Sequence, residues 1–271
     1  MNVLTFDPSL YIRQVVLVGC GGTGSHLARS VARMIYSMKV AGQSVPEVRF
    51  VDPDVVETAN VGRQLFTQAE IGLPKAEALG RRFNFCLGLS VGWFNEAFDP
   101  GKHMDRYRGT ILLGAVDNYL ARRSLAQADR VLWIDCGNHR NAGQVVIGTS
   151  NNRDDLLSQL GRLHDNTIRN LPNAALLYPE LLQPEPESDT APHVSCTELM
   201  HQQEQGVLVN GFVASIAAEY LRKLLHREPI TTHQTTFSGD VLAMRSTPIT
   251  VEGLQSVVNS TMKVQSQLDD F

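Results

Sequence analysis

A glycine-rich turn between a short apolar run and a helical pattern is the feature that most constrains how this chain folds. Residues 15–19 read VVLVG, and the segment Gly19–Gly24 has the GxGxxG spacing. Apolar residues then recur at helical spacing over 25–38, and VRFVD at 48–52 has the character of a second strand. This order predicts a strand, a tight turn, a helix and a second parallel strand, joined by a right-handed crossover.

The same alternation of strands and helices continues through the first half of the chain. Inner runs such as TILLGAV are apolar throughout, which is typical of parallel strands buried on both faces. The expected fold class is α/β: a Rossmann-like doubly wound, mainly parallel sheet with helices on both faces, plus a C-terminal helix and β-hairpin. The further elements expected are a helix at 75–84, a strand at 89–94, a strand at 110–116, a helix at 118–128 and strands at 131–135 and 143–148.

The second half predicts a long loop, a packing helix and a hairpin. Five prolines interrupt every periodic pattern between about 166 and 196, so a loop is expected there. Apolar residues at helical spacing over 207–224 predict a helix that packs on the sheet, and TTHQTTF and VLAMRST around Ser238-Gly239-Asp240 predict the hairpin. The polar stretch from about 257 is expected to fray or to be disordered. We expect a single domain over 1–271, with a nucleotide-binding core at 13–148, the loop at 164–200, the helix and hairpin at 205–249 and the tail at 251–271.

Composition limits the classes of partner. The net charge of −4 and the pI near 6.1 argue against a nucleic-acid or membrane surface, because such surfaces usually need a basic excess. No stretch approaches the roughly 20 apolar residues of a membrane span, and the start MNVLTFDPSL lacks the features of a secretory signal, so we expect a cytoplasmic protein. The 4 cysteines form no CxxC pair, so neither a disulfide framework nor a four-cysteine zinc site is expected.

The residues after the second strand separate different nucleotide chemistries. The glycine spacing alone serves dinucleotide enzymes equally well, and Asp52 at the strand end suits a ribose hydroxyl or a solvated strand terminus. A dehydrogenase, however, has no chemical use for two amides and two cations after its ribose carboxylate, whereas a phosphoryl- or nucleotidyl-transfer site does. These four residues are Asn60, Arg63, Gln64 and Lys75.

Five short motifs, taken in order, resemble one known superfamily. They read GxGGxG, DxDxV, NxxRQ, GxxKA and a strand that leads into DN, and they span roughly residues 15–148, about half of the chain. In order and spacing they are similar to the ThiF/MoeB/HesA superfamily of ubiquitin-activating-enzyme-like adenylyltransferases. The matching residues are Gly19, Gly21, Gly22 and Gly24, then Asp52, Asp54 and Val55, then Asn60, Arg63 and Gln64, then Gly72, Lys75 and Ala76, and finally Asp117 with Asn118.

The resemblance implies an ATP- and magnesium-dependent reaction that activates the C-terminal carboxylate of a small ubiquitin-like or sulfur-carrier protein, in a homodimer. A carboxylate is ionised at neutral pH, so the obstacle is charge repulsion and alignment. Arg63 and Lys75 are expected to neutralise the triphosphate and Asp117 to hold magnesium. Asn60 is expected to orient a phosphate, and Asp52 to hold the ribose. Of the matching residues, all except Asp54, Val55, Gly72 and Ala76 are expected to bind the nucleotide.

Each of these assignments has a plainer alternative outside the family pattern. Arg63 and Lys75 then read as solvated loop cations, and Asn60 reads as a turn former. Asp117 with Asn118 reads as a pair that caps the N-terminus of the following helix.

A second chemical step is assigned to Cys196, at the end of the proline-rich segment. Many members of the superfamily pass the activated carboxyl group to a cysteine or to sulfur, and a nucleophile on a loop can approach an adenylate. His193 or His201 would lower the pKa of its thiol, and an unreactive thiol is the equal alternative. These three residues are too irregularly spaced for a zinc prediction. Cys20 and Cys136 are expected to be packed rather than reactive.

Two other functions remain open from the sequence. An NAD-dependent oxidoreductase needs only the glycine turn and Asp52, but it leaves the later motifs without a purpose. A non-catalytic nucleotide-binding partner protein keeps the ATP site without turnover, and the compact length and the lengthened link at 40–46 are similar to a ThiF-related subgroup found in plasmid-borne cassettes. Relatives also commonly complete the partner subunit's site with an N-terminal arginine, for which Arg13 is the nearby candidate.

Overall fold

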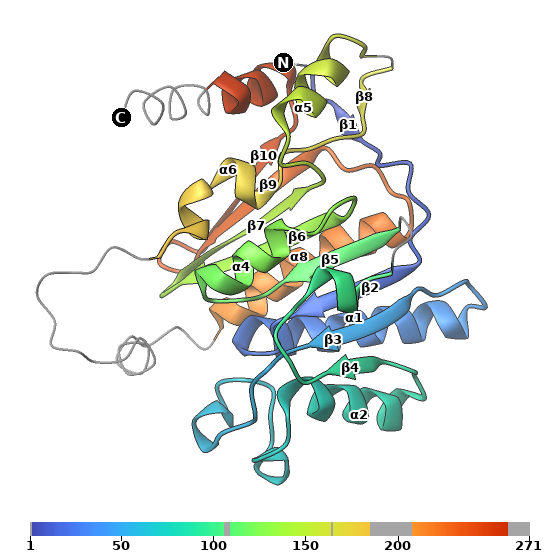
Figure 1. Ribbon diagram of the computed structural model, residues 1–271, viewed down its shortest axis with the longest axis vertical. Helices are drawn as coiled ribbons and strands as arrows, with labels where there is room; N and C mark the ends of the chain where they lie inside the picture. Colours follow the sequence, from blue (N-terminus) through green and yellow to red (C-terminus); the bar gives the residue numbers. More distant parts are fainter. Residues whose placement is uncertain (1, 106–108, 164, 185–207, 260–271) are drawn as a thin grey trace, which may run out of the picture.

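An eight-stranded sheet forms the centre of the protein (Figure 1). In the computed structural model, which describes residues 2–105, 109–163, 165–184 and 208–259, its strands follow the order β10-β9-β7-β6-β5-β2-β3-β4. Strands β2 to β6 pair in parallel, and β7, β9 and β10 are added antiparallel. The predicted Rossmann-like, mainly parallel fold class is confirmed. The strands are β2 (Gln14–Val18), β3 (Glu47–Val51), β4 (Gly92–Phe94), β5 (Thr110–Gly114), β6 (Leu132–His139), β7 (Ala142–Gly148), β9 (Thr232–Ser238) and β10 (Ala243–Pro248).

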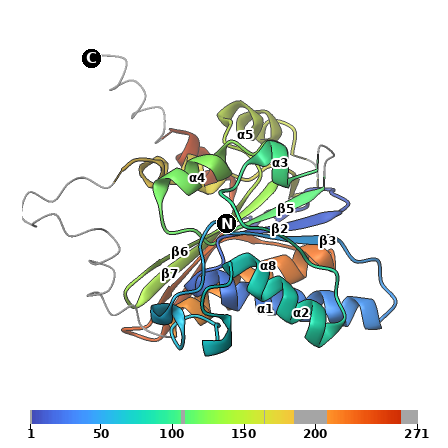
Figure 2. The same cartoon turned by 60° about the horizontal axis from the view of Figure 1, so that its bottom comes forward.

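Helices cover both faces of this sheet, as Figure 2 shows. Strand β2 shows why a helical layer is needed on each face, because its side chains are apolar on both. Val15 and Leu17 belong to the hydrophobic cluster on one face, and Val16 and Val18 belong to the cluster on the other. One face carries α1 (Gly22–Val40), α2 (Lys75–Leu87) and α8 (Val209–Leu225), and the other carries α3 (Pro100–His103), α4 (Tyr119–Ala126) and α5 (Arg153–Leu160).

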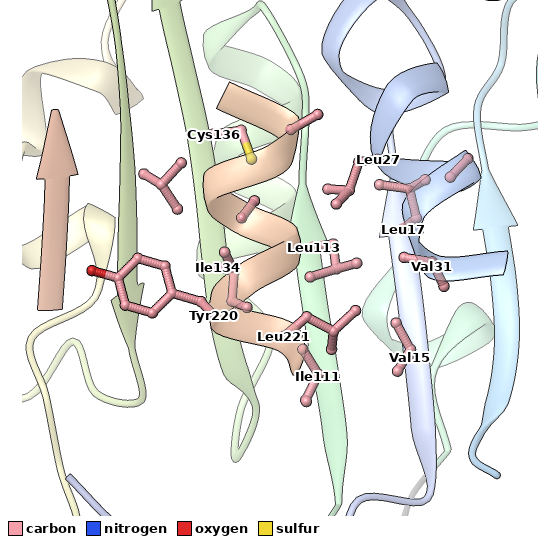
Figure 3. Packing of buried hydrophobic residues seen from close by; sticks show 14 of the residues in the cluster. Val15, Leu17, Leu27, Val31, Ile111, Leu113, Ile134, Cys136, Tyr220 and Leu221 are labelled. Carbon is pink, nitrogen blue, oxygen red and sulfur yellow. The ribbon is translucent and has the colours of Figure 1, made fainter. Parts of the chain in front are cut away.

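The helix α8 confirms the prediction of an amphipathic helix that packs back on the sheet. Figure 3 shows it packed over the sheet and running along the strands, with Leu221 and Tyr220 beside Ile134 and Leu113. Leu221 is fully buried, and the Tyr220 hydroxyl lies 2.8 Å from the Thr235 hydroxyl, so the phenol is buried with a hydrogen-bond partner. This packing fixes where the first turn of α8 meets the rest of the chain.

Several predicted boundaries were wrong, and in each case local geometry explains the difference. The helix α1 starts at Gly22 rather than at 25, because the end of the glycine turn already adopts helical geometry. The helix α2 runs on to Leu87 and stops at Gly88, whose φ of 61° lies in the left-handed region that favours glycine. Strand β6 continues to His139, where it turns directly into β7, so the strand predicted at 131–135 was too short.

The segment predicted as one long loop contains short regular elements in its described part. Strand β8 (Thr167–Ile168) pairs in parallel with β1 (Thr5–Phe6), and α6 (Ala174–Leu177) and η3 (Pro179–Leu182) follow. The hairpin of β9 and β10 is confirmed, and residues 251–259 form helical turns. No helix in the described ranges combines the length and the apolar character needed to cross a membrane.

Candidate functional site

A cleft of about 340 Å³ opens at the carboxyl ends of the parallel strands. It lies where the strand order reverses, because β2 sits between β3 and β5. Gly24 and Asn60 do not line it, and Cys196, with His193 and His201, lies outside the described residues. The predicted binding residues that do line the cleft are Gly19, Gly21, Gly22, Asp52, Arg63, Gln64, Lys75, Asp117 and Asn118.

The glycine turn forms the floor of the cleft through close backbone contacts. Gly19 has a φ of +86°, and a Cβ atom there would lie 2.5 Å from the carbonyl oxygen of Ala115. A Cβ atom on Gly24 would lie 1.8 Å from the Gly19 carbonyl oxygen, so Gly24 serves the packing of the turn. No side chain caps α1 at its N-cap, Gly21, and its first turn contains no acidic residue. The N-terminus of α1 at Gly22 therefore offers unshielded N–H groups and a partial positive charge to an anion.

Asp52 ties the end of β3 to the glycine turn. Its Oδ2 atom accepts a hydrogen bond of 2.5 Å from the Cys20 amide, and its Oδ1 atom accepts one of 2.8 Å from the Asp54 amide. Burial raises the pKa of this carboxyl, while the two amides and the nearby Lys75 ammonium oppose the shift. The carboxylate thus has a structural task besides the ribose contact predicted for it, and each oxygen can accept a further hydrogen bond.

The two cations of the site differ in their partners. Lys75, the first residue of α2, is buried, and its Nζ atom lies 2.8 Å from Oδ2 of Asp54, whose side chain is 63% exposed. Arg63 is half-buried on the cleft wall, and its guanidinium has no carboxylate partner in the part of the chain that the structure describes. A phosphate that enters the cleft would therefore meet one unpaired guanidinium and one ammonium held by an exposed carboxylate.

The two amides of the NxxRQ motif take different positions. Asn60 is buried at the end of η1 (Thr58–Asn60), and its Oδ1 atom accepts a hydrogen bond of 2.9 Å from the Glu57 amide. Its contacts are those of the turn-forming alternative rather than of a phosphate ligand. Gln64 lines the cleft, and its buried Oε1 atom has no hydrogen-bond partner within the described residues. A buried amide oxygen without a partner is costly, which marks Gln64 as a group that a ligand can satisfy.

Asp117 and Asn118 follow β5 at the rim of the cleft. Asn118 is the N-cap of α4, since its Oδ1 atom accepts a hydrogen bond of 2.9 Å from the Ala121 amide. The Asp117 carboxylate is exposed, and its hydrogen bond from the neighbouring Asn118 amide is long, at 3.5 Å. The capping alternative therefore describes Asn118, while Asp117 presents free oxygen atoms to the cleft.

Three polar residues of the cleft were missed from the sequence. The Thr23 hydroxyl donates to Oδ1 of Asn210 at 3.0 Å, and the Asn138 amide donates both to Asn210 and, at 3.2 Å, to the Thr23 hydroxyl. Asn210 also packs against Gly22, where a Cβ atom would lie 2.5 Å from its Nδ2 atom. The signal for Asn210 was a polar residue on the same helical face as the apolar Val213, Ala217 and Leu221. The signal for Asn138 was its alternation with Cys136 along a longer strand.

Two cysteines near the site are packed thiols, as the sequence predicts. Cys20 and Cys136 are both buried, and burial raises the pKa of each thiol well above its ordinary value. Neighbouring carboxylates raise both pKa values further, through Asp52 for Cys20 and Asp135 for Cys136. Neither thiol is therefore activated as a nucleophile.

The fold and the position of the cleft define a Rossmann-like α/β protein. A free helix N-terminus, two cations and an exposed carboxylate meet at the carboxyl ends of the strands, the edge at which open α/β sheets generally bind ligands. The chain belongs to the ThiF family, whose sequence profile matches residues 9–256.

Two curated relatives illustrate how far the sequence similarity extends. The ubiquitin-like modifier-activating enzyme 5 of Drosophila ananassae is 29% identical in an alignment 159 residues long, gaps included, that covers 52% of this chain and 38% of that protein. The enzyme of the same name from Aedes aegypti is also 29% identical over 159 residues, with the same shares. The match therefore covers only about two fifths of these relatives.

Solved structures show the same fold at low sequence identity. PaaA has a TM-score of 0.54 at 16% identity, and the match covers 88% of this chain and 64% of that one. MccB of E. coli, solved with AMPCPP and MccA, has a TM-score of 0.51 at 17% identity and covers 87% of this chain and 63% of that one. At these identities the likeness concerns the fold alone.

Proposed function

We propose that this protein is an ATP-dependent adenylyltransferase that activates the C-terminal carboxylate of a small ubiquitin-like or sulfur-carrier protein. The observation that carries the proposal is the convergence, in a ThiF-family chain, of the uncapped N-terminus of α1 with Arg63, Lys75 and Asp117 in one cleft. An oxidoreductase would leave the two cations and the exposed carboxylate without a task.

The residues of the cleft fit the charge of a triphosphate. The first turn of α1 would receive phosphate oxygens, and Gln64 Oε1 would accept a hydrogen bond from the nucleotide or its hydration shell. Arg63 would neutralise phosphate charge directly, while Lys75 would exchange its exposed partner Asp54 for the nucleotide. Each of these contacts lowers the repulsion that keeps an anionic carboxylate from approaching the α-phosphate.

The proposed reaction needs no general base. The substrate carboxylate is ionised at neutral pH, so its oxygen attacks the α-phosphorus directly. A new carboxylate–phosphorus bond forms, the bond between the α-phosphorus and its bridging oxygen breaks, and pyrophosphate leaves with that electron pair. Asp117 fits a magnesium ligand, because its exposed carboxylate is free to share the ion with phosphate oxygens. Magnesium bound there would neutralise charge on the leaving pyrophosphate.

The relatives support the substrate class. The curated relatives are named as activating enzymes of ubiquitin-like modifiers, and MccB was solved with AMPCPP together with MccA. The cleft is open at the carboxyl edge of the sheet, where an extended chain terminus can reach the nucleotide. The proposal includes a homodimer and a later transfer of the acyl group to Cys196.

ATP–pyrophosphate exchange tests the proposed activity. Purified protein is incubated with labelled pyrophosphate, magnesium, ATP and, in turn, recombinant ubiquitin-like and sulfur-carrier proteins that end in glycine. Exchange should require one of these acceptors, and Arg63→Ala or Asp117→Ala should lower it by about 100-fold. Arg81→Ala is the matched control, since Arg81 lies on α2 and pairs with Glu77 outside the cleft lining. ATP binding without exchange for any acceptor would instead support a non-catalytic nucleotide-binding protein.

Two finer points need separate measurements. Arg13 directly precedes β2, at the end of the sheet away from this chain's own cleft, so only a second subunit could receive it. Light scattering should therefore give the mass of a dimer, and Arg13→Ala should weaken exchange if Arg13 completes the partner's site. A thioester at Cys196 should appear as an acceptor adduct that a reducing thiol cleaves and that Cys196→Ala abolishes.

A further inference from the structure

A buried charge pair lies beneath the rim of the cleft. Arg122 on α4 and Asp135 on β6 are 9% and 1% exposed, and the Arg122 Nε atom lies 3.8 Å from Oδ2 of Asp135. The Nε atom and both carboxylate oxygens are buried without a hydrogen-bond partner among the described residues, and so is the indole Nε1 atom of Trp133. These groups meet above Gly114, where a Cβ atom would lie 2.8 Å from Trp133 Nε1 and 3.2 Å from Asp135 Oδ1.

A contribution to the stability of the fold does not explain why this chain keeps a buried charge pair here. The attraction across 3.8 Å has no hydrogen bond to support it, and the burial of two charges costs several kcal/mol per ion, so apolar residues of similar volume are often as good or better. The only buried residues of the short helix α4 are Arg122 and Leu125, so one of the two is a charged residue. The placement of the pair points to another use.

Asp135 holds both ends of the segment that carries the rim residues. Gly114, the last residue of β5, is the strand partner of Asp135 in the sheet. Eight residues later, Arg122 returns to the same aspartate through its side chain, and its amide bonds to the carbonyl oxygen of Asn118 at 3.2 Å. Asp117 and Asn118 lie within the loop that these two contacts close. The loop that carries the exposed Asp117 carboxylate is therefore bounded at both ends by contacts with Asp135.

We propose that Arg122 and Asp135 are positioning residues. Their buried pair holds the Asp117–Asn118 loop in the position at which Asp117 can bind the magnesium ion of magnesium-bound ATP. The inference rests on the proposed function, because it assumes that the cleft binds ATP and that Asp117 is the magnesium ligand. Neither Arg122 nor Asp135 lines the cleft, so their effect passes through the loop. Misplaced supporting groups around a metal ligand typically weaken metal binding by 10- to 100-fold.

The test compares ATP affinity with magnesium and with a chelator, by calorimetry, in four variants. Asp135→Asn should lower the affinity for magnesium-bound ATP on the order of tenfold but the affinity for ATP alone by less than about threefold. Arg122→Lys should retain much of the magnesium preference, because it keeps the charge. The apolar double variant Arg122→Met with Asp135→Leu should unfold no more easily than the wild type and still lose the preference.

Leu125→Ala is the matched control, because it loosens the packing of α4 beside Gly114 but leaves both charged side chains in place. It should lower the unfolding temperature but keep the ratio of the two affinities. The inference fails if the apolar double variant binds magnesium-bound ATP as the wild type does, or if Leu125→Ala loses the magnesium preference as Asp135→Asn does. If Asp135→Asn fails to fold, the apolar double variant decides alone. A wild type that binds no ATP would overturn the proposed function itself, which is a distinct result.

Discussion

Replacing Asp135 by asparagine should remove a pH dependence that this carboxyl imposes on folding. Asp135 is 1% exposed, and burial raises its pKa from the ordinary 3.8 to about 6, although Arg122 opposes the shift. A carboxyl whose pKa is raised in the folded state binds its proton more tightly there than in the unfolded chain. Its contribution to stability is therefore fully present below the unfolded pKa and is lost as the pH rises through about 6.

The magnitude follows from the two pKa values. The interval from 3.8 to about 6, at about 1.36 kcal/mol per pH unit, corresponds to about 3 kcal/mol of unfolding free energy. Near pH 4 the wild type and Asp135→Asn both carry a neutral side chain at this position, so their stabilities should be similar. Above about pH 7 the variant should be the more stable chain by about 3 kcal/mol. The opposite expectation is that breaking a buried ion pair costs about 3 to 5 kcal/mol.

Urea unfolding followed by circular dichroism, from about pH 4 to about pH 8, separates these expectations. The informative quantity is the difference between the two chains at each pH, because other titrating groups contribute equally to both. A difference that grows in favour of the variant with rising pH supports the argument. A variant that is several kcal/mol less stable above about pH 7 would refute it, because attraction to Arg122 would then outweigh the cost of burial.

Three further changes test the geometry of the cleft. Gly24→Ala should destabilise the protein by about 3 kcal/mol in thermal unfolding, because the new Cβ atom would lie 1.8 Å from the Gly19 carbonyl oxygen. Asp54→Asn should raise ATP affinity in calorimetry by up to about fivefold, because releasing Lys75 from an exposed partner recovers about 1 kcal/mol or less. Asn210→Ala should cost about 1 to 3 kcal/mol in urea unfolding, because it removes the acceptor of two hydrogen bonds.

Each of these changes has a neutral counterpart in the same chain. Gly211 lies within α8, where alanine is favoured over glycine, and its new Cβ atom would meet nothing closer than the His26 ring at 3.7 Å. Gly211→Ala should therefore be neutral or slightly stabilising. Glu77→Gln removes a carboxylate outside the cleft lining and should leave ATP affinity unchanged. Ser215→Ala removes an exposed hydroxyl on α8 and should leave stability unchanged. The reasoning on Gly24 is wrong if Gly24→Ala unfolds at the wild-type temperature. The reasoning on Asp54 is wrong if Asp54→Asn binds ATP more weakly. The reasoning on Asn210 is wrong if Asn210→Ala is as stable as Ser215→Ala.

The sequence predicted the elements whose signals are local. The run at 15–19, the glycine turn and the following periodicity gave β2 and α1 because apolar spacing and backbone freedom are written in adjacent residues. The end of β6 was missed because the polar residues after Asp135 suggest a loop, and only pairing with β7 extends the strand to His139. The short α5 was missed as well, since its eight residues show little amphipathic pattern.

The candidate site divides in the same way. Motif spacing identified Gly19, Gly21, Gly22, Arg63, Lys75 and Asp117, which all line the cleft, and also Gly24, which does not. The NxxRQ motif did not indicate that Asn60 accepts a hydrogen bond from the Glu57 amide, because that contact depends on the conformation of the folded loop. The contact of Thr23 with Asn210 spans 187 residues, and neither residue carries a local signal for it.

The far end of the chain supplies the last wall of a cleft whose recognisable motifs all come from the first half. A fragment ending after β7 would keep every motif that suggests nucleotide binding, yet Gly22 would face solvent where Asn210 now stands. The pocket is therefore complete only when α8 is docked on the sheet. A nucleotide that binds only the completed pocket stabilises the docked position of α8 by its own binding free energy. Nucleotide should therefore protect α8 from hydrogen exchange and from proteolysis.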